Sequence, residues 1–261
     1  MKIIDFHTHI YPSAIAEKAT KSIEKFYGLD GGGMNGTSEQ LLEVGKSVGI
    51  EKFVVLPVAI KHEHTRHINE FILSETAKHS EFIGFGTVHA EQSDILAEGE
   101  YILNSGLKGI KMHPDTQLFN IDDERLFPLY DYIGDKLLFM FHLGDKRYDY
   151  SHPKRLRRVL DNFPKLRVVA THFGGYSVWD EALELLKGTD CMLDISSSLM
   201  FMDETAKNKY INAYGADRLL FGSDFPLWNP ETELERFMGL KLSQTDREKI
   251  AFKNAERILN L

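Results

Sequence analysis

Runs of apolar residues, rich in β-branched and aromatic side chains, recur along the chain, and each run ends in polar residues. Such runs are typical of buried β-strands. The eight runs span residues 2–10, 52–59, 82–90, 108–114, 137–144, 166–174, 191–197 and 219–226. They begin about 25 to 30 residues apart after a first gap of about 50, close to the length of a strand–helix–strand unit. The pattern therefore predicts a repeated alternation of strand and helix.

Stretches with a helical spacing of apolar positions lie between these runs. They span residues 38–48, 65–78, 94–104, 123–133, 153–162, 178–186, 203–214 and 231–238, and a closing stretch spans residues 244–259. Thr37 or Ser38, Asp203 and Ser243 stand at expected N-caps, and Pro153 stands in a first turn, where proline is tolerated. Eight strand–helix units predict an α/β fold of the (β/α)8 TIM-barrel type, since a doubly wound sheet usually has about five to seven strands.

The composition is consistent with one large barrel domain over residues 1–261. The chain is 43% hydrophobic and 27% charged, which allows a substantial core. No Pro/Ser-rich linker or block of charge separates the units. Residues 31–33 are three consecutive glycines in the long first connection, and we interpret them as a flexible loop that acts as a mobile lid over one end of the barrel.

Charge and cysteine content narrow the partners and the location. Lys and Arg number 31 against 39 Asp and Glu, a formal net charge of -8, so the chain lacks the basic surplus that binds a phosphate backbone. No apolar run approaches the ~20 residues of a membrane helix. A single cysteine and the lack of an apolar signal core predict a cytoplasmic protein. We expect a small-molecule substrate, no nucleic-acid or membrane partner, and a homo-oligomer that pairs through apolar groups such as Phe201, Met202 or Phe237.

Potential metal ligands gather at the ends of the predicted strands, where a barrel carries its reactive groups. Six of the 11 histidines stand at such ends. An isolated H-x-H pattern would be weak evidence, but several nitrogen and oxygen ligands that converge at a barrel mouth form an open, zinc-type site. The candidates are His7 and His9, which share one face of the first strand with Asp5, His142 on the fifth strand, His172 on the sixth and Asp224 on the eighth.

Short motifs at these positions carry a family resemblance. They are D-F-H-T-H at residues 5–9, G-I-K-M-H-P at 109–114, F-H-L-G at 141–144, T-H-F-G-G at 171–175, G-S-D-F-P at 222–226 and N-A at 254–255. In this order they resemble the amidohydrolase superfamily of metal-dependent hydrolases. The chain is most similar to the amidohydrolase-2 branch, which includes aminocarboxymuconate-semialdehyde decarboxylase and many predicted hydrolases.

The resemblance implies a metal site and a division of roles. It implies that His7, His9, His142 and Asp224 hold one divalent metal, which we expect to be zinc, and that His172 stands beside the metal-bound water. A divalent ion lowers the pKa of bound water toward ~7. Asp224 would take the proton of that water and pass it to a leaving group, and His172 would orient the water or polarise the substrate carbonyl. Replacing His172 should spare metal content more than activity.

Three further residues are candidates for substrate binding. Lys111 is charged and pairs with Asp5 or an anionic substrate, or it is carbamylated and bridges two metals, as the strand-four lysine does in dihydroorotases. His113 shares its face of the strand and is a substrate contact or a supporting group. Arg147, on a loop at the mouth, would grip a substrate carboxylate.

Other side chains near the site have two interpretations each. Asp194 and Ser196 alternate on the seventh strand toward the interior, so they either support the site from below or satisfy each other. Tyr176 and Trp179 follow the 171–175 motif and either form a wall of the pocket or pack in the core.

Three enzyme functions are compatible with this site. The main hypothesis is a hydrolase that opens an amide, lactone or ester in a small carbonyl- or carboxylate-containing molecule through a metal-activated water. The alternative is a non-oxidative decarboxylase that uses the same metal site. A TatD-like phosphoester or DNA hydrolase ranks third, because strand four carries Lys111 and His113 where those barrels usually have a glutamate ligand, and because the net charge is -8.

Overall fold

Nine short parallel strands make up the central barrel in residues 1–29 and 33–261, the part of the chain that the computed structural model describes. The strands are β1 (Ile4–Thr8), β2 (Lys52–Val55), β3 (Phe82–Gly84), β4 (Gly86–Thr87), β5 (Gly109–Met112), β6 (Leu138–Phe141), β7 (Arg167–Ala170), β8 (Met192–Asp194) and β9 (Leu219–Leu220). Each pairs with the next in the chain, except that β3 and β4 are two halves of the third predicted strand. Phe85 separates these halves, and its N–H still bonds the Val55 carbonyl at 3.1 Å.

The last strand returns to the first, which closes the ring. The Phe6 N–H donates to the Phe221 carbonyl at 2.9 Å, and Thr8 forms a parallel bridge with Phe225. The predicted (β/α)8 barrel is therefore confirmed. Closure also brings the segment that follows β9 beside the end of β1, although the two are separated by most of the chain.

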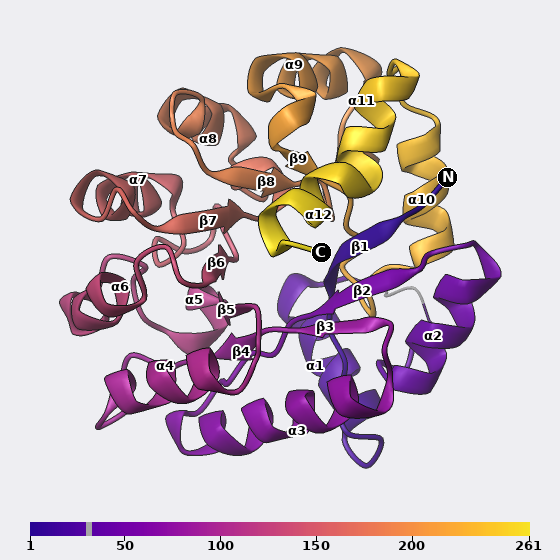
Figure 1. Cartoon of the computed structure of the whole chain (residues 1–261). Coiled ribbons are helices and arrows are strands. Elements are labelled where there is room, and N and C mark those ends of the chain that lie inside the picture. The colour runs from indigo at the N-terminus through magenta and orange to yellow at the C-terminus, as the bar shows by residue number, and fades with distance from the viewer. Residues whose placement is uncertain (30–32) are drawn as a thin grey trace.

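Helices surround the strands, as Figure 1 shows. They are α1 (Ala16–Tyr27), α2 (Ser38–Ser47), α3 (Thr65–Lys78), α4 (Ile95–Asn104), α5 (Pro114–Gln117), α6 (Phe127–Ile133), α7 (Pro153–Asn162), α8 (Trp179–Leu186), α9 (Glu204–Tyr214), α10 (Pro230–Met238), α11 (Gln244–Glu248) and α12 (Asn254–Leu259). Thr37, Asp203 and Ser243 each accept a backbone N–H at a helix start, so these predicted caps are confirmed.

The helices differ from the prediction in three places. The short helix α5 follows β5 directly, where no helix was predicted. A helix, α1, occupies the long first connection, which the hydrophobic pattern left unassigned. The closing helix is divided into α11 and α12 by a π-helical turn over Lys249–Lys253. Of the three glycines interpreted as a lid, Gly31 and Gly32 lie outside the described residues.

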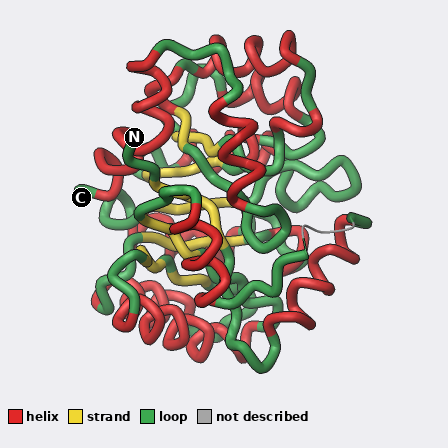
Figure 2. Tube along the Cα trace, turned by 90° about the vertical axis from the view of Figure 1, so that its right-hand side faces the viewer, coloured by secondary structure: helices red, strands yellow, loops and turns green. Residues whose placement is uncertain are grey.

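The interior of the barrel is filled by side chains, as in other barrels of this size. Residues from the strands, such as Phe6 and Met140, form one apolar cluster with Ile258 and Leu259 of α12. Figure 1 shows α12 crossing one end of the barrel, and Figure 2 shows both termini at that same end. The opposite end, at the carboxyl ends of the strands, is therefore the end that can open into a site.

Two of the apolar groups expected to mark an oligomer surface are buried. Met202 is 9% exposed and Phe237 is fully buried, so this expectation is wrong for both, whereas Phe201 is 45% exposed. Phe237, on α10, packs against Phe221. The apolar side of this helix therefore faces the interior of the domain.

No helix in the described part of the chain is both long and apolar enough to cross a membrane.

Candidate functional site

Three potential metal ligands converge where β1 meets the segment after β9. The His9 N–H bonds the Phe225 carbonyl and the Asp224 N–H bonds the His7 carbonyl, both at 2.7 Å. Asp224 has a φ of 62°, a left-handed conformation that is uncommon outside glycine and concentrates at functional sites. The Nε2 atoms of His7 and His9 lie 3.2 Å apart, and Asp224 Oδ1 lies 3.3 and 3.5 Å from them.

The remaining contacts of these rings test whether a cation fits between them. The Nδ1 of His9 bonds the Leu56 carbonyl at 2.6 Å, and the Nδ1 of His7 faces Asp194 Oδ2 at 3.0 Å. A carbonyl and a carboxylate only accept, so both Nδ1 atoms carry the hydrogen and both Nε2 atoms present lone pairs. Two lone pairs and a carboxylate oxygen thus face one another. This donor set fits a divalent cation, and the outer hydrogen bonds orient its rings.

Asp194 and Ser196 support this group from below. Asp194 Oδ1 accepts hydrogen bonds from the backbone N–H of His172 at 3.2 Å and from the Ser196 hydroxyl at 2.6 Å. The Ser196 oxygen lies 3.0 Å from Nδ1 of both His7 and His172. Both residues are completely buried at the end of β8. Both interpretations drawn from the sequence therefore apply. Asp194 and Ser196 bond each other, and they also contact His7 and His172 from below.

His142 is separated from His7, His9 and Asp224 by the ring of His172. The Nδ1 of His172 faces the Ser196 carbonyl at 3.0 Å, which leaves its Nε2 as an acceptor for the Nδ1 of His142, also at 3.0 Å. Among the described residues, His142 clusters with His113 and Asp115, whereas His7 and Asp224 cluster with His9. Burial, the largest cause, lowers the pKa of His142 and of His172, so both rings are neutral at pH 7.

His113 stacks on His142, and both reach a tyrosine that the sequence did not indicate. Their ring centroids lie 3.8 Å apart. The Tyr27 hydroxyl lies 2.8 Å from Nε2 of His113 and 3.3 Å from Nε2 of His142. The helix-forming residues that precede Gly28 could have predicted α1. Nothing in the sequence indicates that its last residue turns into the barrel mouth.

Lys111 lies at the bottom of the same site. Its side chain is fully buried, and Nζ lies 3.4 Å from Nε2 of His7. The predicted pair with Asp5 is not formed in the described structure, because Asp5 Oδ1 accepts the backbone N–H groups of His7 and Ser223 instead. Burial lowers the pKa of Lys111 to about 8, although Asp194 and Asp224 act in the opposite direction. Among the described residues, Lys111 is thus a buried amine without a carboxylate partner.

Arg147 does not line the pocket. Its Nε and Nη2 donate to the Asp145 carboxylate at 2.9 and 2.6 Å, and its Nη1 donates to the Phe26 carbonyl at 2.6 Å. The guanidinium group expected to grip a substrate carboxylate is therefore engaged with the protein itself.

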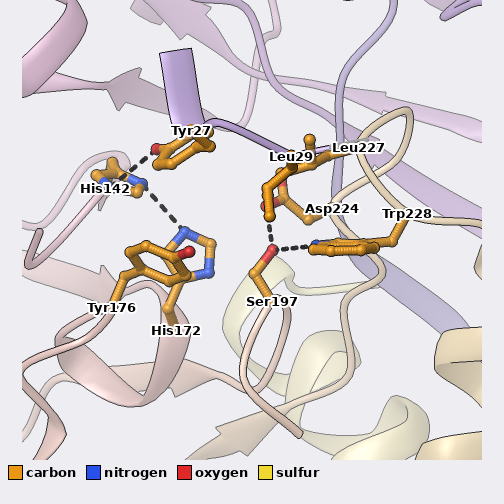
Figure 3. A pocket seen from close by; sticks show the side chains of 9 residues that line it. All are labelled: Tyr27, Leu29, His142, His172, Tyr176, Ser197, Asp224, Leu227 and Trp228. Atoms are coloured by element: carbon orange, nitrogen blue, oxygen red, sulfur yellow. Dashed lines mark hydrogen bonds between the residues drawn. The ribbon is translucent and has the colours of Figure 1, made fainter. Parts of the chain in front are cut away.

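A small pocket opens above these groups. Figure 3 shows its lining, which consists of Tyr27, Leu29, His142, His172, Tyr176, Ser197, Asp224, Leu227 and Trp228. The Ser197 hydroxyl donates to Asp224 Oδ2 and accepts from the Trp228 indole N–H. Tyr176 forms a wall of the pocket, while Trp179 donates to the His172 carbonyl at 3.1 Å. The pocket walls are mostly aromatic and aliphatic, and the two imidazoles, the Ser197 hydroxyl and the Asp224 carboxylate are its polar groups.

Comparisons with known proteins identify the family of this chain. The family model described as amidohydrolase matches residues 4–261, and the chain therefore belongs to the amidohydrolase family. This confirms the resemblance carried by the motifs. A gamma-resorcylate decarboxylase from Polaromonas sp. strain JS666 is 26% identical over 123 residues, which span 40% of this chain and 37% of that protein.

Solved structures share the whole barrel. An uncharacterised TIM-barrel protein from Bordetella bronchiseptica superposes with a TM-score of 0.83 at 23% identity, over 100% of this chain and 99% of the other. A dihydroxybenzoic acid decarboxylase from Polaromonas sp. JS666, with bound manganese and the inhibitor 2-nitroresorcinol, gives a TM-score of 0.75 at 17% identity, over 100% and 97%. At these identities the likeness establishes the fold.

Proposed function

We propose that this protein is a divalent-metal-dependent decarboxylase of a small hydroxylated aromatic acid. The observation that carries the proposal is the convergence of His7, His9 and Asp224 beside the buried amine of Lys111, beneath a small pocket with aromatic walls. The relatives named as decarboxylases of resorcylate and dihydroxybenzoate support this alternative over the hydrolase that was our main hypothesis.

The proposed ligands are His7, His9 and Asp224. His142, which the resemblance implies as a fourth ligand, bonds His172 in the described structure and is proposed as a ligand only if its ring turns toward the ion. Manganese is bound in several of the similar solved structures, and zinc is our expectation from the donor set, so elemental analysis of the purified protein has to identify the ion. A divalent cation bound here would supply Lewis acidity that draws negative charge from the substrate's carboxylate and adjacent oxygen.

Each remaining group has a proposed task. Lys111 binds the anionic substrate through a charge-assisted hydrogen bond, and His113 contacts the substrate. Asp224 is an ionised carboxylate, because the adjacent imidazoles hold its pKa below the usual range although burial raises it. We assign Asp224 as the base that takes the proton of a neighbouring ring hydroxyl and returns it to the ring carbon. The C–C bond to the carboxylate then breaks, CO2 leaves, and the phenolate product takes a proton from water.

The neutral His172 orients the substrate in this scheme. It can do so because Ser196 and Asp194 hold its Nδ1 and its backbone N–H from below. Tyr176 and Trp228 exclude water and hold the ring, since aromatic side chains bury a large area with few rotatable bonds.

Product analysis tests this function. Purified protein is incubated with Mn²⁺ and 2,6-dihydroxybenzoate in D2O, and Asp224→Asn and enzyme-free samples serve as controls. The proposal expects one CO2 released for each resorcinol formed, with deuterium at the carbon that lost the carboxylate. A parallel panel of amides, lactones and esters is assayed in H2(18)O. Incorporation of 18O into products of that panel, with no CO2 from aromatic acids, would restore the hydrolase hypothesis.

A further inference from the structure

The end of α1 is held in place by a residue far away in the chain. The helix ends at Tyr27, and Gly28 follows with a φ of 65°. The N–H groups of Gly28 and Leu29 bond the carbonyls of Lys25 and Glu24 at 3.2 and 3.0 Å, a common way to satisfy the last turn. The next carbonyl, that of Phe26, accepts a hydrogen bond from Arg147 instead.

Arg147 is built into this contact from several sides. Asp145 is only 3% exposed and binds the guanidinium group through Nε and Nη2. The guanidinium carbon also lies 4.9 Å from the ring centroid of Phe26 and 5.2 Å from that of Tyr148. A cation that donates to a carbonyl at a helix C-terminus is favoured by the helix dipole, and the aromatic rings add cation–π attraction.

The residue after Phe26 is the tyrosine that lines the pocket. Tyr27 directly follows Phe26, and its hydroxyl bonds Nε2 of His113 at 2.8 Å while it lines the pocket (Figure 3). We propose that Arg147 is a positioning residue that holds the end of α1 over the barrel mouth, so that Tyr27 forms one wall of the pocket and fixes His113 and His142. As a statement about the reaction, this rests on the proposed function.

A second pair in the chain supplies a matched control. Arg125 binds Asp123 with the same sequence spacing and the same donors. The backbone N–H, Nε and Nη2 of Arg125 donate to the Asp123 carboxylate at 3.0, 2.9 and 2.7 Å. The hydrogen bonds and cation–π contacts of the described residues join Arg147, and not Arg125, to α1. Arg147→Gln and Arg125→Gln therefore break ion pairs of the same geometry. They differ in the contact with the helix and in the burial of the carboxylate side chain, which is 2% exposed in Asp145 and 18% exposed in Asp123.

Hydrogen exchange tests the structural part without any substrate. Peptides that cover α1 are compared by mass spectrometry among the wild type, R147Q and R125Q. We expect exchange in the last turn to be at least tenfold faster in R147Q and unchanged in R125Q. Because R147Q leaves Asp145 buried without its cation, the double variant D145N/R147Q is measured as well. Wild-type exchange of α1 in R147Q or in the double variant would overturn the proposal.

A double-mutant cycle tests whether Arg147 acts through Tyr27. We expect R147Q and Tyr27→Phe each to lower kcat/KM by about ten- to a hundredfold, since small displacements of positioning groups have effects of this size. R147Q should cause no further loss in the Y27F background. An equal rise of KM in both backgrounds would instead mean that Arg147 binds the substrate directly, which contradicts the proposal. If the wild type decarboxylates no acid, the proposed function fails, and hydrogen exchange still decides the role of Arg147.

Discussion

At the scale of single residues, the site depends on which nitrogen of each histidine carries the hydrogen. The partners of His7 and His9 are a carboxylate and a carbonyl, which leave both Nε2 atoms free as ligands. His172 has the same arrangement with the Ser196 carbonyl, but its Nε2 accepts from His142. Rings of the same type therefore have different tasks, because their outer hydrogen bonds differ.

Substitutions of His9 and of His172 should differ in their effects on metal content and on activity. We expect His9→Asn to reduce the metal from about one ion per chain to well below half, since it removes a ligand. His172→Asn should retain the metal and lower kcat by about a hundredfold or more. Both are measured by elemental analysis beside steady-state kinetics. His67→Asn, at an exposed position of α3, is the control and should change neither quantity. Equal metal loss in both site variants would make His172 a ligand.

Lys111 should contribute mainly to binding of the acid. A charge-assisted hydrogen bond contributes about 1.5–3 kcal/mol, so Lys111→Met should raise KM by roughly ten- to a hundredfold. Lys108→Met, at an exposed position just before β5, should leave KM unchanged. The metal stoichiometry of the same samples decides the carbamylation alternative: a fall from two ions to one in Lys111→Met would show that this lysine bridges two metals.

At the scale of elements, the loops at the barrel mouth pack tightly against one another. Gly144 follows the His142 turn with a φ of 71°, and a Cβ placed there would meet the Gly175 backbone at 2.6 Å. Only glycine satisfies both conditions. The F-H-L-G and T-H-F-G-G motifs thus carry glycines that allow two histidine-bearing loops to approach each other.

Replacing Gly144 should therefore lower the free energy of unfolding by more than the cost of its left-handed backbone conformation alone. Gly49→Ala is the matched control, because Gly49 has a φ of 80° but open space around its Cβ position. We expect G49A to lower the free energy of unfolding by about 1 kcal/mol, the usual cost of the left-handed conformation. G144A should lower it by more than ~2 kcal/mol, since backbone atoms must move. Urea unfolding measures both, and equal midpoints would contradict the close approach.

The whole molecule should be more stable with its metal than without it. Ligands from β1 and from the segment after β9 meet only in the closed barrel, so the ion binds the folded chain alone. At a free Mn²⁺ concentration of about a hundred times Kd, this stabilises the fold by ~2.7 kcal/mol. For a chain of this size, the increase in Tm is then roughly 5–10 °C.

Differential scanning calorimetry with Mn²⁺ and with a chelator measures this increase in Tm. Asp224→Asn should lose it, and the exposed variant His67→Asn should keep it. An increase that persists in Asp224→Asn would place the ion elsewhere in the protein.

The repeat of strands and helices and most of the ligand types could be predicted from the sequence, because period and spacing are local properties. The helix α1 was not predicted, because it is an extra helix in the first connection and belongs to no regular strand–helix unit. Its last residue, Tyr27, lies at the barrel mouth. Phe237 was expected at the surface for a different reason: the identity of a single residue does not show which other residues cover it.

Local pattern alone determined the barrel, its caps and the histidines and aspartate at strand ends, since alternation and helical period depend only on neighbouring residues. Barrel closure decided the rest. It set the distances among His7, His9 and Asp224 and joined His142 to the site through His172. It also placed Lys111 beside His7 and turned Arg147 toward Phe26. These contacts link residues far apart in the chain, and only the packing of the complete ring brings such residues together.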